Sequence, residues 1–482
     1  MAAQQVQHGG GPAPGVRWRR PSERGVQADG TGPLAAAFTL LKCNWGIGMM
    51  GMPFMLNTAG TISGVVMFVA SMALTQLSIA RVLDVGAAVQ RRPAQPSAKA
   101  GLLPAAAARE EQLDYSGIMS RSLGGLGEWL ALLSIIISAW GSCIAYLLFI
   151  KDNLHSLWPG LLPEWLWVLL ASVPLALLSL LDDVRRLAPV SVVGLACAFS
   201  FACLVVAEAA LHLSADDVRE FFAEEPVVRW KTLPLAMAVA AFCNEGKRTL
   251  LSIARRRPRC PSPFPVLFSS GIVILTPSTR NGMRRPGGFL HVSGWTIAFF
   301  TVCYMAVGLC GNIRYAGHVE QQLSLNFDMS SVANRVAVLM YCLQLIPTYC
   351  VVYFCAYEAS ELKFIRERGI ERHSLEHKRL RPKVVLLRWL GLGTSAAIAL
   401  VVPRFGDYIG LIGAVATSLA IYILPHVAWL RECRAGKPCG TVVSVAVAVF
   451  GVLLAVVGTI QSVQGMLDSA ASGSGSSSAG TS

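Results

Sequence analysis

Apolar residues gather along this chain in windows of about 20 residues that contain few charges. A helix needs about this length to cross a hydrocarbon core that is about 30 Å thick. The pattern therefore predicts an all-α integral membrane protein with about eleven transmembrane helices. The predicted spans lie near 34–57, 61–85, 126–150, 164–182, 187–211, 231–253, 287–311, 336–358, 384–403, 405–430 and 440–464.

The segments outside these spans are polar. Residues 1–33 are rich in Gly, Gln and Arg, and residues 465–482 are rich in Ser and Gly. Neither segment carries enough apolar surface to fold, so we expect both to be disordered. Residues 34–464 form the predicted transmembrane domain. Within it, the apolar stretch Phe264–Thr276 is too short to span, and we place residues 254–282 in a cytoplasmic insertion.

The composition supports a membrane protein. Only 14% of the residues are charged and 54% are hydrophobic, which argues against a soluble domain and against a disordered chain. The net charge of +13 would suggest nucleic acid as the partner of a soluble chain. Here we expect no nucleic acid partner, because Lys and Arg collect in the cytoplasmic loops of membrane proteins. The expected surroundings are a lipid bilayer.

The positions of the basic residues predict the orientation. With a cytoplasmic N-terminus, 29 of the 41 Lys and Arg residues lie in inside segments and six lie in outside segments. Such an excess on one side is typical of cytoplasmic loops. None of the 13 Cys residues lies in a predicted outside loop, so no disulfide framework is expected. No spacing typical of a zinc site is present, and we expect neither a metal nor another cofactor.

The first span contains residues that break helices. Asn44, Gly46, Gly48, Gly51 and Pro53 fall within ten residues. Close helix packing through small residues is one interpretation. The other is a discontinuous helix, because unwound backbone is tolerated at membrane depth where it is buried or lines a cavity. Free N–H groups at the start of its second half would then bind an anionic group, in space that a Cβ atom at Gly48 would fill.

The sixth span contains a polar island at the matching position. Phe242, Cys243 and Asn244 precede Glu245 there, and two basic residues follow at 247–248. Spans 1–5 and 6–10 would then form a 5+5 inverted repeat, with span 11 outside it. A carboxylate inside the membrane is costly and usually marks a substrate or proton path, so Glu245 is a candidate for ion coupling. An ion pair with its basic neighbours, or a position near the interface, is the alternative.

Other polar residues in the spans carry weaker signals. Thr348 follows Pro347 in the eighth span, where its hydroxyl is either an ion ligand or bonded within its own helix. Asp84, Glu208 and Asp407 lie near the ends of spans, where a charged side chain can reach the interface.

Three motifs in order give the chain a family resemblance. Their residues are Gly46, Gly48, Pro53 and Gly60 in the first span, Phe242, Glu245 and Gly246 in the sixth, and Pro403, Phe405, Gly406, Asp407, Ile412, Gly413, Ile423, Leu424 and Pro425 around the tenth. The chain thereby resembles the amino acid/auxin permease family over roughly 34–464, with Met50 in place of the usual leucine. It departs from the family at 254–282, either through a lineage-specific loop or through an unspliced stretch of the gene model.

The resemblance implies a LeuT-like fold of the APC superfamily and secondary active transport of an amino acid. The coupling ion would be a proton or sodium. A proton is favoured because Glu245 is available and no set of sodium ligands is evident, and Thr348 is the second candidate for ion coupling. The expected substrate-binding residues are Asn44, Gly46, Ile47, Gly48, Phe242, Cys243 and Asn244.

Two other functions remain open at this point. The same fold can serve as an amino-acid sensor that binds its ligand without transporting it, and the sequence does not separate the two. A membrane enzyme is the third possibility, since His373 and His377 have a metal-binding spacing, but a di-iron site needs several such pairs. We therefore predict a protein that is not an enzyme. Its membrane, either the plasma membrane or a vacuolar or endosomal membrane, is not indicated by any motif.

Overall fold

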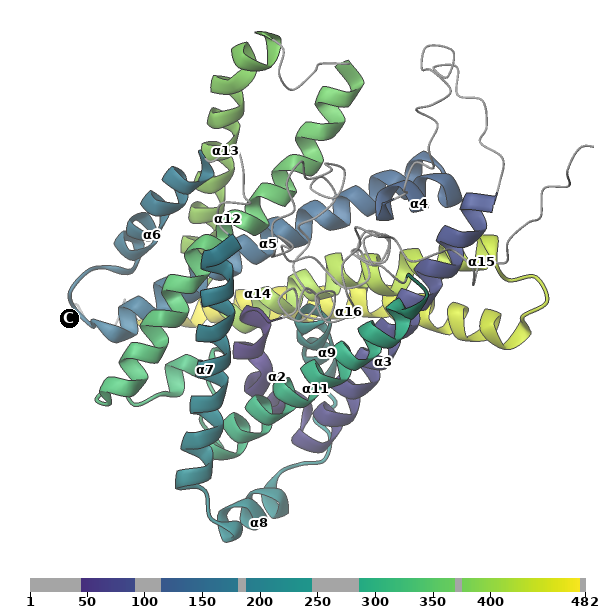
Figure 1. Ribbon diagram of the computed structural model, residues 1–482. Helices are drawn as coiled ribbons and strands as arrows, with labels where there is room; N and C mark the ends of the chain where they lie inside the picture. The colour runs from purple at the N-terminus through teal and green to yellow at the C-terminus, as the bar shows by residue number, and fades with distance from the viewer. Residues whose placement is uncertain (1–44, 92–113, 181–187, 245–285, 369–374, 477–482) are drawn as a thin grey trace, which may run out of the picture.

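The computed structural model describes residues 45–91, 114–180, 188–244, 286–368 and 375–476. Every regular element in these ranges is a helix, as the apolar windows predict (Figure 1). The elements are η2 (Ile47–Gly51), α2 (Met52–Ala59), α3 (Thr61–Arg91), α4 (Tyr115–Leu123), α5 (Gly125–Leu157), α6 (Glu164–Ser179), α7 (Ala188–His212), α8 (Ala215–Glu224), α9 (Leu233–Cys243), η6 (Pro286–Gly288), α11 (Phe289–Arg314), η7 (Leu323–Asn326), α12 (Val332–Arg368), α13 (Leu375–Val401), α14 (Phe405–Ile412), η8 (Gly413–Ile423), α15 (Leu424–Glu432) and α16 (Pro438–Ser476).

Ten of the predicted spans correspond to helices in the described ranges. Seven helices are long and apolar enough to cross a membrane, namely α3, α5, α7, α11, α12, α16 and the continuous helix formed by α14, η8 and α15. Helices α6 and α9 and the last part of α13 are shorter and apolar. Together they match the second to the eleventh predicted span, which confirms a helical multi-pass membrane protein. The number of crossings stays a prediction, because the described part of the first span begins at Trp45.

The spanning helices differ in how deeply they are buried. In α5 and in the helix from α14 to α15, 78% of the apolar window is buried, whereas in α16 the share is 28%. Figure 1 shows α16 running alongside α14 and α15, and the end of α3 approaching α15. Side chains on the open face of α16 are apolar, as a surface facing lipid requires. They include Val442, Val445, Val449, Val452 and Val456.

The tenth span is wound partly as a π-helix. Its middle section, η8, lies between α14 and α15 without an interruption. Gly413 begins η8 and lies against α9, since a Cβ atom built there would be 2.0 Å from the carbonyl oxygen of Ala238. Only glycine permits this approach of the two backbones. The contact holds the middle of α9 against one of the two most deeply buried helices.

The structure differs from the predicted segments at three places. Helix α16 extends to Ser476 and therefore includes part of the predicted disordered tail 465–482. It continues because Met466 packs on the core and the Ser469 hydroxyl lies 3.1 Å from Arg404 Nη1. Helices α4 and α8 occupy segments that the hydropathy pattern leaves as loops. The predicted disordered segment 1–33 and the predicted insertion 254–282 lie outside the described residues.

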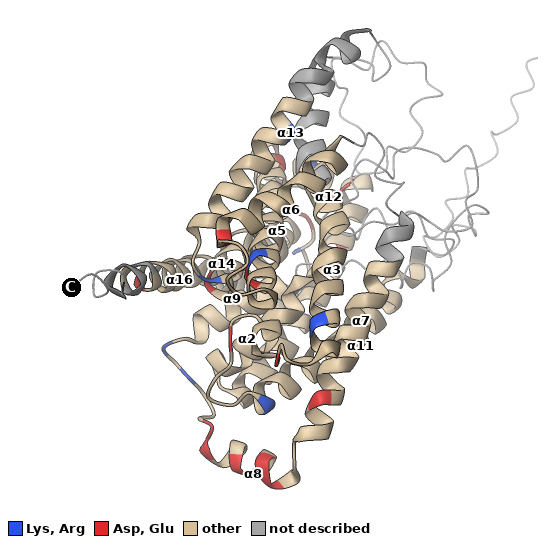
Figure 2. Ribbon diagram, turned by 90° about the vertical axis from the view of Figure 1, so that its left-hand side faces the viewer, with Lys and Arg blue, Asp and Glu red and all other residues tan. Residues whose placement is uncertain are grey.

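Helix α8 forms because of a signal at its start. The Ser214 side chain accepts a hydrogen bond from the Asp217 N–H, and the Asp217 carboxylate accepts one from the Ser214 N–H. This capping box satisfies two N–H groups that would otherwise have no partner. Figure 2 shows acidic residues on α8, at one end of the molecule and away from the apolar bundle.

Candidate substrate and ion site

The chain is irregular at Trp45 and Gly46, where the first span was predicted to be interrupted. Gly46 is extended, with φ −133° and ψ −169°, and the 3₁₀ helix η2 begins at the next residue. Helix α2 then starts at Met52 with Pro53 in its first turn, where a missing N–H costs nothing. The backbone thus passes from extended to 3₁₀ to α-helical within a buried segment.

The Gly46 carbonyl oxygen is surrounded by donors. It accepts the N–H of Met49 at 3.2 Å, the hydroxyl of Tyr341 at 3.3 Å and the hydroxyl of Tyr304 at 3.4 Å. Tyr304 comes from α11 and Tyr341 from α12, so two distant helices meet at this oxygen. The Met49 N–H belongs to the first turn of η2, and the two hydroxyls add donors from outside it, as suits a carbonyl buried in a membrane.

Aromatic packing holds both tyrosines in place. The Tyr341 ring lies 5.1 Å from that of Phe201 and 5.3 Å from that of Phe149, between centroids. The Tyr304 ring lies 3.9 Å from Phe300 and stacks at 6.1 Å on Phe68. Contacts of this kind fix a ring in one orientation. The two hydroxyl groups therefore remain directed at the Gly46 carbonyl.

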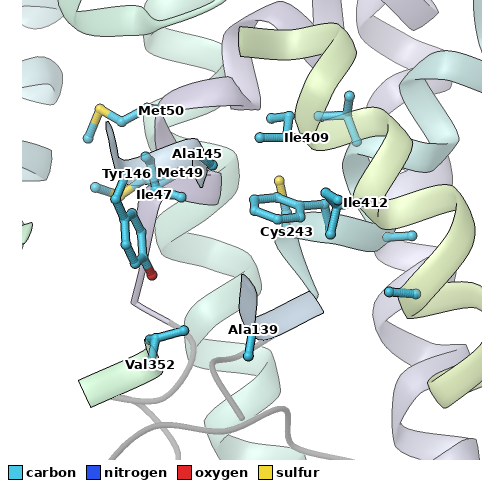
Figure 3. Packing of buried hydrophobic residues seen from close by; sticks show 14 of the residues in the cluster. Ile47, Met49, Met50, Ala139, Ala145, Tyr146, Cys243, Val352, Ile409 and Ile412 are labelled. Carbon is cyan, nitrogen blue, oxygen red and sulfur yellow. The ribbon is translucent and has the colours of Figure 1, made fainter. Parts of the chain in front are cut away.

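Gly48 lies directly against the end of α9. The Cys243 thiol donates to the Gly48 carbonyl oxygen at 3.1 Å. A Cβ atom built at Gly48 would be 3.0 Å from Cys243 Cα. In this structure a Cβ atom at Gly48 would therefore meet α9, and the expectation that it would fill substrate space stays a prediction. Figure 3 shows Cys243 in the same apolar packing as Ile47, Met49 and Ile412.

Helix α9 ends where the polar island begins. Its last residue is Cys243, and the N–H of Asn244 still bonds to the carbonyls of Ala240 and Ala241. The Asn244 side chain is buried and donates through Nδ2 to the Ser71 hydroxyl on α3. Its Oδ1 has no hydrogen-bond partner among the described residues.

The structure brings together most of the predicted substrate-binding residues that it describes. Gly46, Ile47 and Gly48 form one wall, and Cys243 and Asn244 lie at the end of α9, with Phe242 one residue earlier and buried. Asn44 and Glu245 lie outside the described residues. Their predicted roles stay predictions.

The Thr348 hydroxyl is bonded within its own helix, which was one of its two interpretations. It donates to the Gln344 carbonyl of that helix at 2.7 Å. No contact between Thr348 and the segment from Gly46 to Gly51 is found in the part of the chain that the structure describes. The α12 residue that reaches the interrupted helix is Tyr341. Tyrosine hydroxyls inside apolar spans are the signal that could have pointed to Tyr304 and Tyr341.

A second cluster of polar residues lies at one end of the helix bundle. Lys151 near the end of α5 is buried, with Nζ 3.2 Å from Asp152 and 3.3 Å from Glu164. The Asn153 amide donates to Gln322 Oε1 at 2.9 Å, and the Gln322 amide donates to Asp152. We call these five residues the α5-end network. It ties α5 to the segment that leads into η7.

Asp407 lies near this network on α14. The sequence placed it at a span end, where its carboxylate would reach the interface. The structure buries it instead, with Oδ2 3.4 Å from Arg404 Nε. The adjacent Gly406 N–H donates to Gln321 Oε1, beside the α5-end network.

Known proteins resemble this chain in sequence and in fold. The model of the family described as transmembrane amino acid transporter protein matches residues 29–276 and 265–464. The chain belongs to this family. The transporter contains no group of three or more His, Cys, Asp or Glu residues suited to a metal in its described part. Its family and its structural relatives consist of transporters, which fits a protein that is not an enzyme.

Relatives of the transporter cover most of its length. It is 23% identical to amino acid transporter ANT1 of Arabidopsis thaliana over 417 residues, 84% of this chain and 86% of the relative. It is 23% identical to the proton-coupled amino acid transporter-like protein pathetic of Drosophila melanogaster, over 80% of this chain and 74% of the relative. It is 22% identical to sodium-coupled neutral amino acid transporter 7 of Xenopus laevis, over 83% and 80%.

A solved structure supports the fold. The transporter superposes on MhsT in complex with L-phenylalanine with a TM-score of 0.51 at 12% identity, covering 90% of this chain and 100% of MhsT. MhsT has the LeuT fold, so the predicted LeuT-like fold is confirmed. The inverted 5+5 repeat stays a prediction.

Proposed function

We propose that this chain is a secondary active transporter that moves an amino acid together with a proton. The choice of ion rests on the hydrogen bonds that the Gly46 carbonyl oxygen accepts. In LeuT-like transporters, unwound backbone carbonyls are typical ligands of a coupling sodium ion. Here the Gly46 oxygen accepts two tyrosine hydroxyls and one N–H. The Gly48 oxygen accepts the Cys243 thiol.

A sodium ion at these oxygens would have to displace their donors. Sodium binds oxygen atoms, and donor hydrogens directed at an oxygen occupy the positions that the ion needs. The Thr348 hydroxyl, the second candidate for ion coupling, donates within α12 and makes no hydrogen bond to these oxygens in the described part of the chain. Proton coupling is favoured because it needs a titratable group and no set of free oxygens. Glu245, which follows Asn244 directly, is the proposed carrier at the site.

The amino acid is proposed to bind between η2 and the end of α9. The amides at the start of a helix attract a carboxylate through their positive partial charge. Helices η2 and α2 together place such a start at Ile47 and Gly48. The buried Asn244 side chain retains an unpaired acceptor among the described residues, which suits a ligand that carries an ammonium group.

The proposed orientation places the N-terminus in the cytoplasm. Arg81 and Arg91 of α3 and Arg431 of α15 then lie on the cytoplasmic side. The acidic helix α8 lies on the opposite side, in the extracellular space or in the lumen of an organelle. This distribution of basic residues is that of other multi-pass proteins.

Uptake by the purified protein in proteoliposomes tests the proposal. Radiolabelled amino acids would be offered with a pH gradient alone, a sodium gradient alone, both or neither. We expect accumulation with the pH gradient and none with sodium alone. Accumulation that needs sodium and ignores pH would overturn proton coupling and favour the sodium-coupled alternative.

Glu245→Gln sharpens this experiment. The amide keeps the size and the hydrogen-bonding capacity of the side chain and removes its titration. We expect exchange of labelled for unlabelled amino acid at equal pH to persist and accumulation driven by a pH gradient to fail. Full pH-driven accumulation by this variant would show that the coupled proton does not bind Glu245.

A further inference from the structure

Polar side chains form a line along one face of α3. Ser71, Thr75 and Ser78 lie four and three residues apart, so they project from the same side of the helix. All three are buried. Tyr422 at the end of η8 and His426 on α15, also four residues apart, lie opposite them. We call these five residues the α3 file.

The file begins at the candidate site. Asn244 at the end of α9 donates to the Ser71 hydroxyl, and Ser71 Oγ lies 2.8 Å from the Tyr422 hydroxyl. The Ser71 oxygen accepts from Asn244, and either hydroxyl of the Ser71–Tyr422 pair can be the donor in the bond between them. Thr75 is close enough to the Tyr422 hydroxyl to interact with it. Ser71, Tyr422 and Thr75 thus form one polar cluster next to Asn244.

The file continues to a buried histidine. Ser78 Oγ lies 3.2 Å from His426 Nε2, and the Ser78 hydroxyl donates to the Leu74 carbonyl at 2.9 Å. The Ser78 oxygen must then accept a hydrogen from Nε2. That leaves Nδ1 of a neutral imidazole as an acceptor. Nδ1 is buried and has no hydrogen-bond partner among the described residues.

An exposed carboxylate, Asp84, follows Ser78 by six residues on α3. Asp84 lies at the end of α3 that the charge distribution assigns to the cytoplasm, and its Oδ2 accepts the Trp429 indole N–H at 3.1 Å. The Arg81 guanidinium lies 3.8 Å above the Trp429 ring and donates to the Gly440 carbonyl at 3.4 Å. The Trp429 side chain thus contacts both Asp84 and Arg81.

Several elements that pack around His426 carry charged or titratable groups. They are Arg81 and Asp84 on α3, Asp114, Tyr115 and Arg121 of α4 and its cap, Tyr422 on η8, Arg431 and Glu432 on α15, Cys433 and Lys437 in the following turn, and Cys439 on α16. The imidazole that these groups surround belongs to His426. Its side chain has no exposed surface, whereas Asp84 is exposed.

We propose that the α3 file conducts the coupled proton between the binding site and the cytoplasm, with His426 as the residue that carries it. Nδ1 accepts the proton to give an imidazolium, and later releases a proton towards Asp84, which restores the neutral side chain. The Ser71 and Tyr422 hydroxyls each accept one proton as they give one up, and their hydrogens turn back before the next cycle. The inference rests on the proton coupling proposed above.

The α3 file has two gaps that a proton must cross. Tyr422 and His426 are four residues apart, which corresponds to about 6 Å along an α-helix. A single water molecule bridges such a distance between polar groups. The second gap lies at Arg81 and Trp429, whose stacked side chains must separate before Asp84 can receive the proton. Release would therefore coincide with movement of α3 relative to α15.

His426→Gln tests the proposal in proteoliposomes, with His318→Gln as the matched control. Glutamine keeps a donor for Ser78 and does not titrate, and His318 is exposed in the segment after α11. Two rates would be measured with radiolabelled amino acids: exchange at equal pH, and accumulation driven by a pH gradient. A pH-sensitive dye inside the vesicles would report proton entry that depends on the amino acid.

We expect His426→Gln to keep exchange within about twofold and to lose pH-driven accumulation and proton entry by at least about tenfold, since a positioned proton-transfer group typically contributes about 10²-fold or more. The control should match the unaltered protein. Accumulation by His426→Gln equal to that of the control would overturn the inference alone. If the unaltered protein shows no pH-driven accumulation, the proposed function itself is wrong.

Tyr422→Phe provides a second test that does not depend on His426→Gln folding. The ring keeps its edge contact with Phe450 and loses only the hydroxyl that lies between Ser71 and His426. We expect proton entry to slow by at least about fivefold, with exchange unchanged, because one proton-transfer step is missing. Proton entry at the unaltered rate would show that the file does not conduct.

Discussion

The α5-end network and the α3 file are both buried and polar, yet they are built from different groups. The network contains a lysine and two acids that pair at 3.2 and 3.3 Å, and amides that bond to one another. The file contains hydroxyls and one imidazole, and it retains an unpartnered ring nitrogen in the described part of the chain. Paired charges hold helices in one arrangement, whereas a line of neutral groups with a spare acceptor can accept a proton.

The first prediction concerns the ion pairs of the network. Lys151→Ala removes the cation and leaves the Asp152 carboxylate, three-quarters of which is buried, without its partner. Breaking a buried pair in this way costs about 3–5 kcal/mol. We expect the largest loss of stability of the variants considered, measured as thermal unfolding in detergent. Arg219→Ala on α8, where the side chain is exposed, is the control and should change little. An equal, small effect of both would show that the network does not hold the helices.

The second prediction lies between the two regions, at the contact of Gly48 with Cys243. Gly48→Val places a side chain 3.0 Å or less from the α9 backbone, which must move away. Overpacking of this kind costs about 1–3 kcal/mol. We expect reduced stability together with loss of amino acid uptake, because the two interrupted segments separate. Gly393→Val on α13 is the control, since nothing lies within 4 Å of a Cβ there. Normal uptake by Gly48→Val would contradict the assigned contact.

The third prediction concerns the file. Thr75→Val removes a hydroxyl that donates to the Ser71 carbonyl of its own helix, and it keeps the shape of the side chain. A single neutral hydrogen bond contributes about 0.5–1.5 kcal/mol, so the unfolding temperature should fall far less than in Lys151→Ala. A loss as large as that of Lys151→Ala would mean that the file is structural and as rigid as the network.

The fourth and smallest effect is expected at exposed charges on α8. Hydrogen bonds from the Ser214 N–H and hydroxyl lower the pKa of Asp217. The capping box therefore adds stability at pH values above the pKa of an unfolded aspartate, and this is lost as the pH falls through the lower folded pKa. The protection of α8 against hydrogen exchange, measured by mass spectrometry and corrected for the intrinsic exchange rate at each pH, should be higher at neutral pH than in acid. Ser214→Ala should weaken this dependence, and an unchanged profile would contradict the capping assignment.

Hydropathy predicts the spanning helices of this protein well, because crossing a membrane requires a long apolar window. It does not find α4 and α8, which are too short and too polar. Capping residues mark both of them: Asp114 accepts the Gly117 N–H at 2.6 Å, and Ser214 pairs with Asp217. Short helices of this kind are better predicted from their first turn than from their hydrophobicity.

The candidate site likewise has features that the sequence predicts and features that it does not. The extended backbone at Gly46 and the 3₁₀ turn after it are predictable from local sequence, since glycine and proline determine backbone conformation. The partners Tyr304 and Tyr341 are not, because only the tertiary fold brings them to the Gly46 oxygen. Lys151 illustrates the opposite error, since its charge places it in an outside loop and its partners allow it to be buried. Charge predicts exposure only where no partner is near.

The Gly46 carbonyl also has a consequence for the order of synthesis. Its tyrosine partners follow it by 258 and 295 residues. Ribosomes add about 5–20 residues per second, so the oxygen waits roughly 10–60 s for them. During that time the first span has a polar gap that lipid cannot satisfy. The nascent helix must therefore remain beside water or the insertion machinery until α11 and α12 arrive. Biogenesis of this protein then depends on late helices completing an early one.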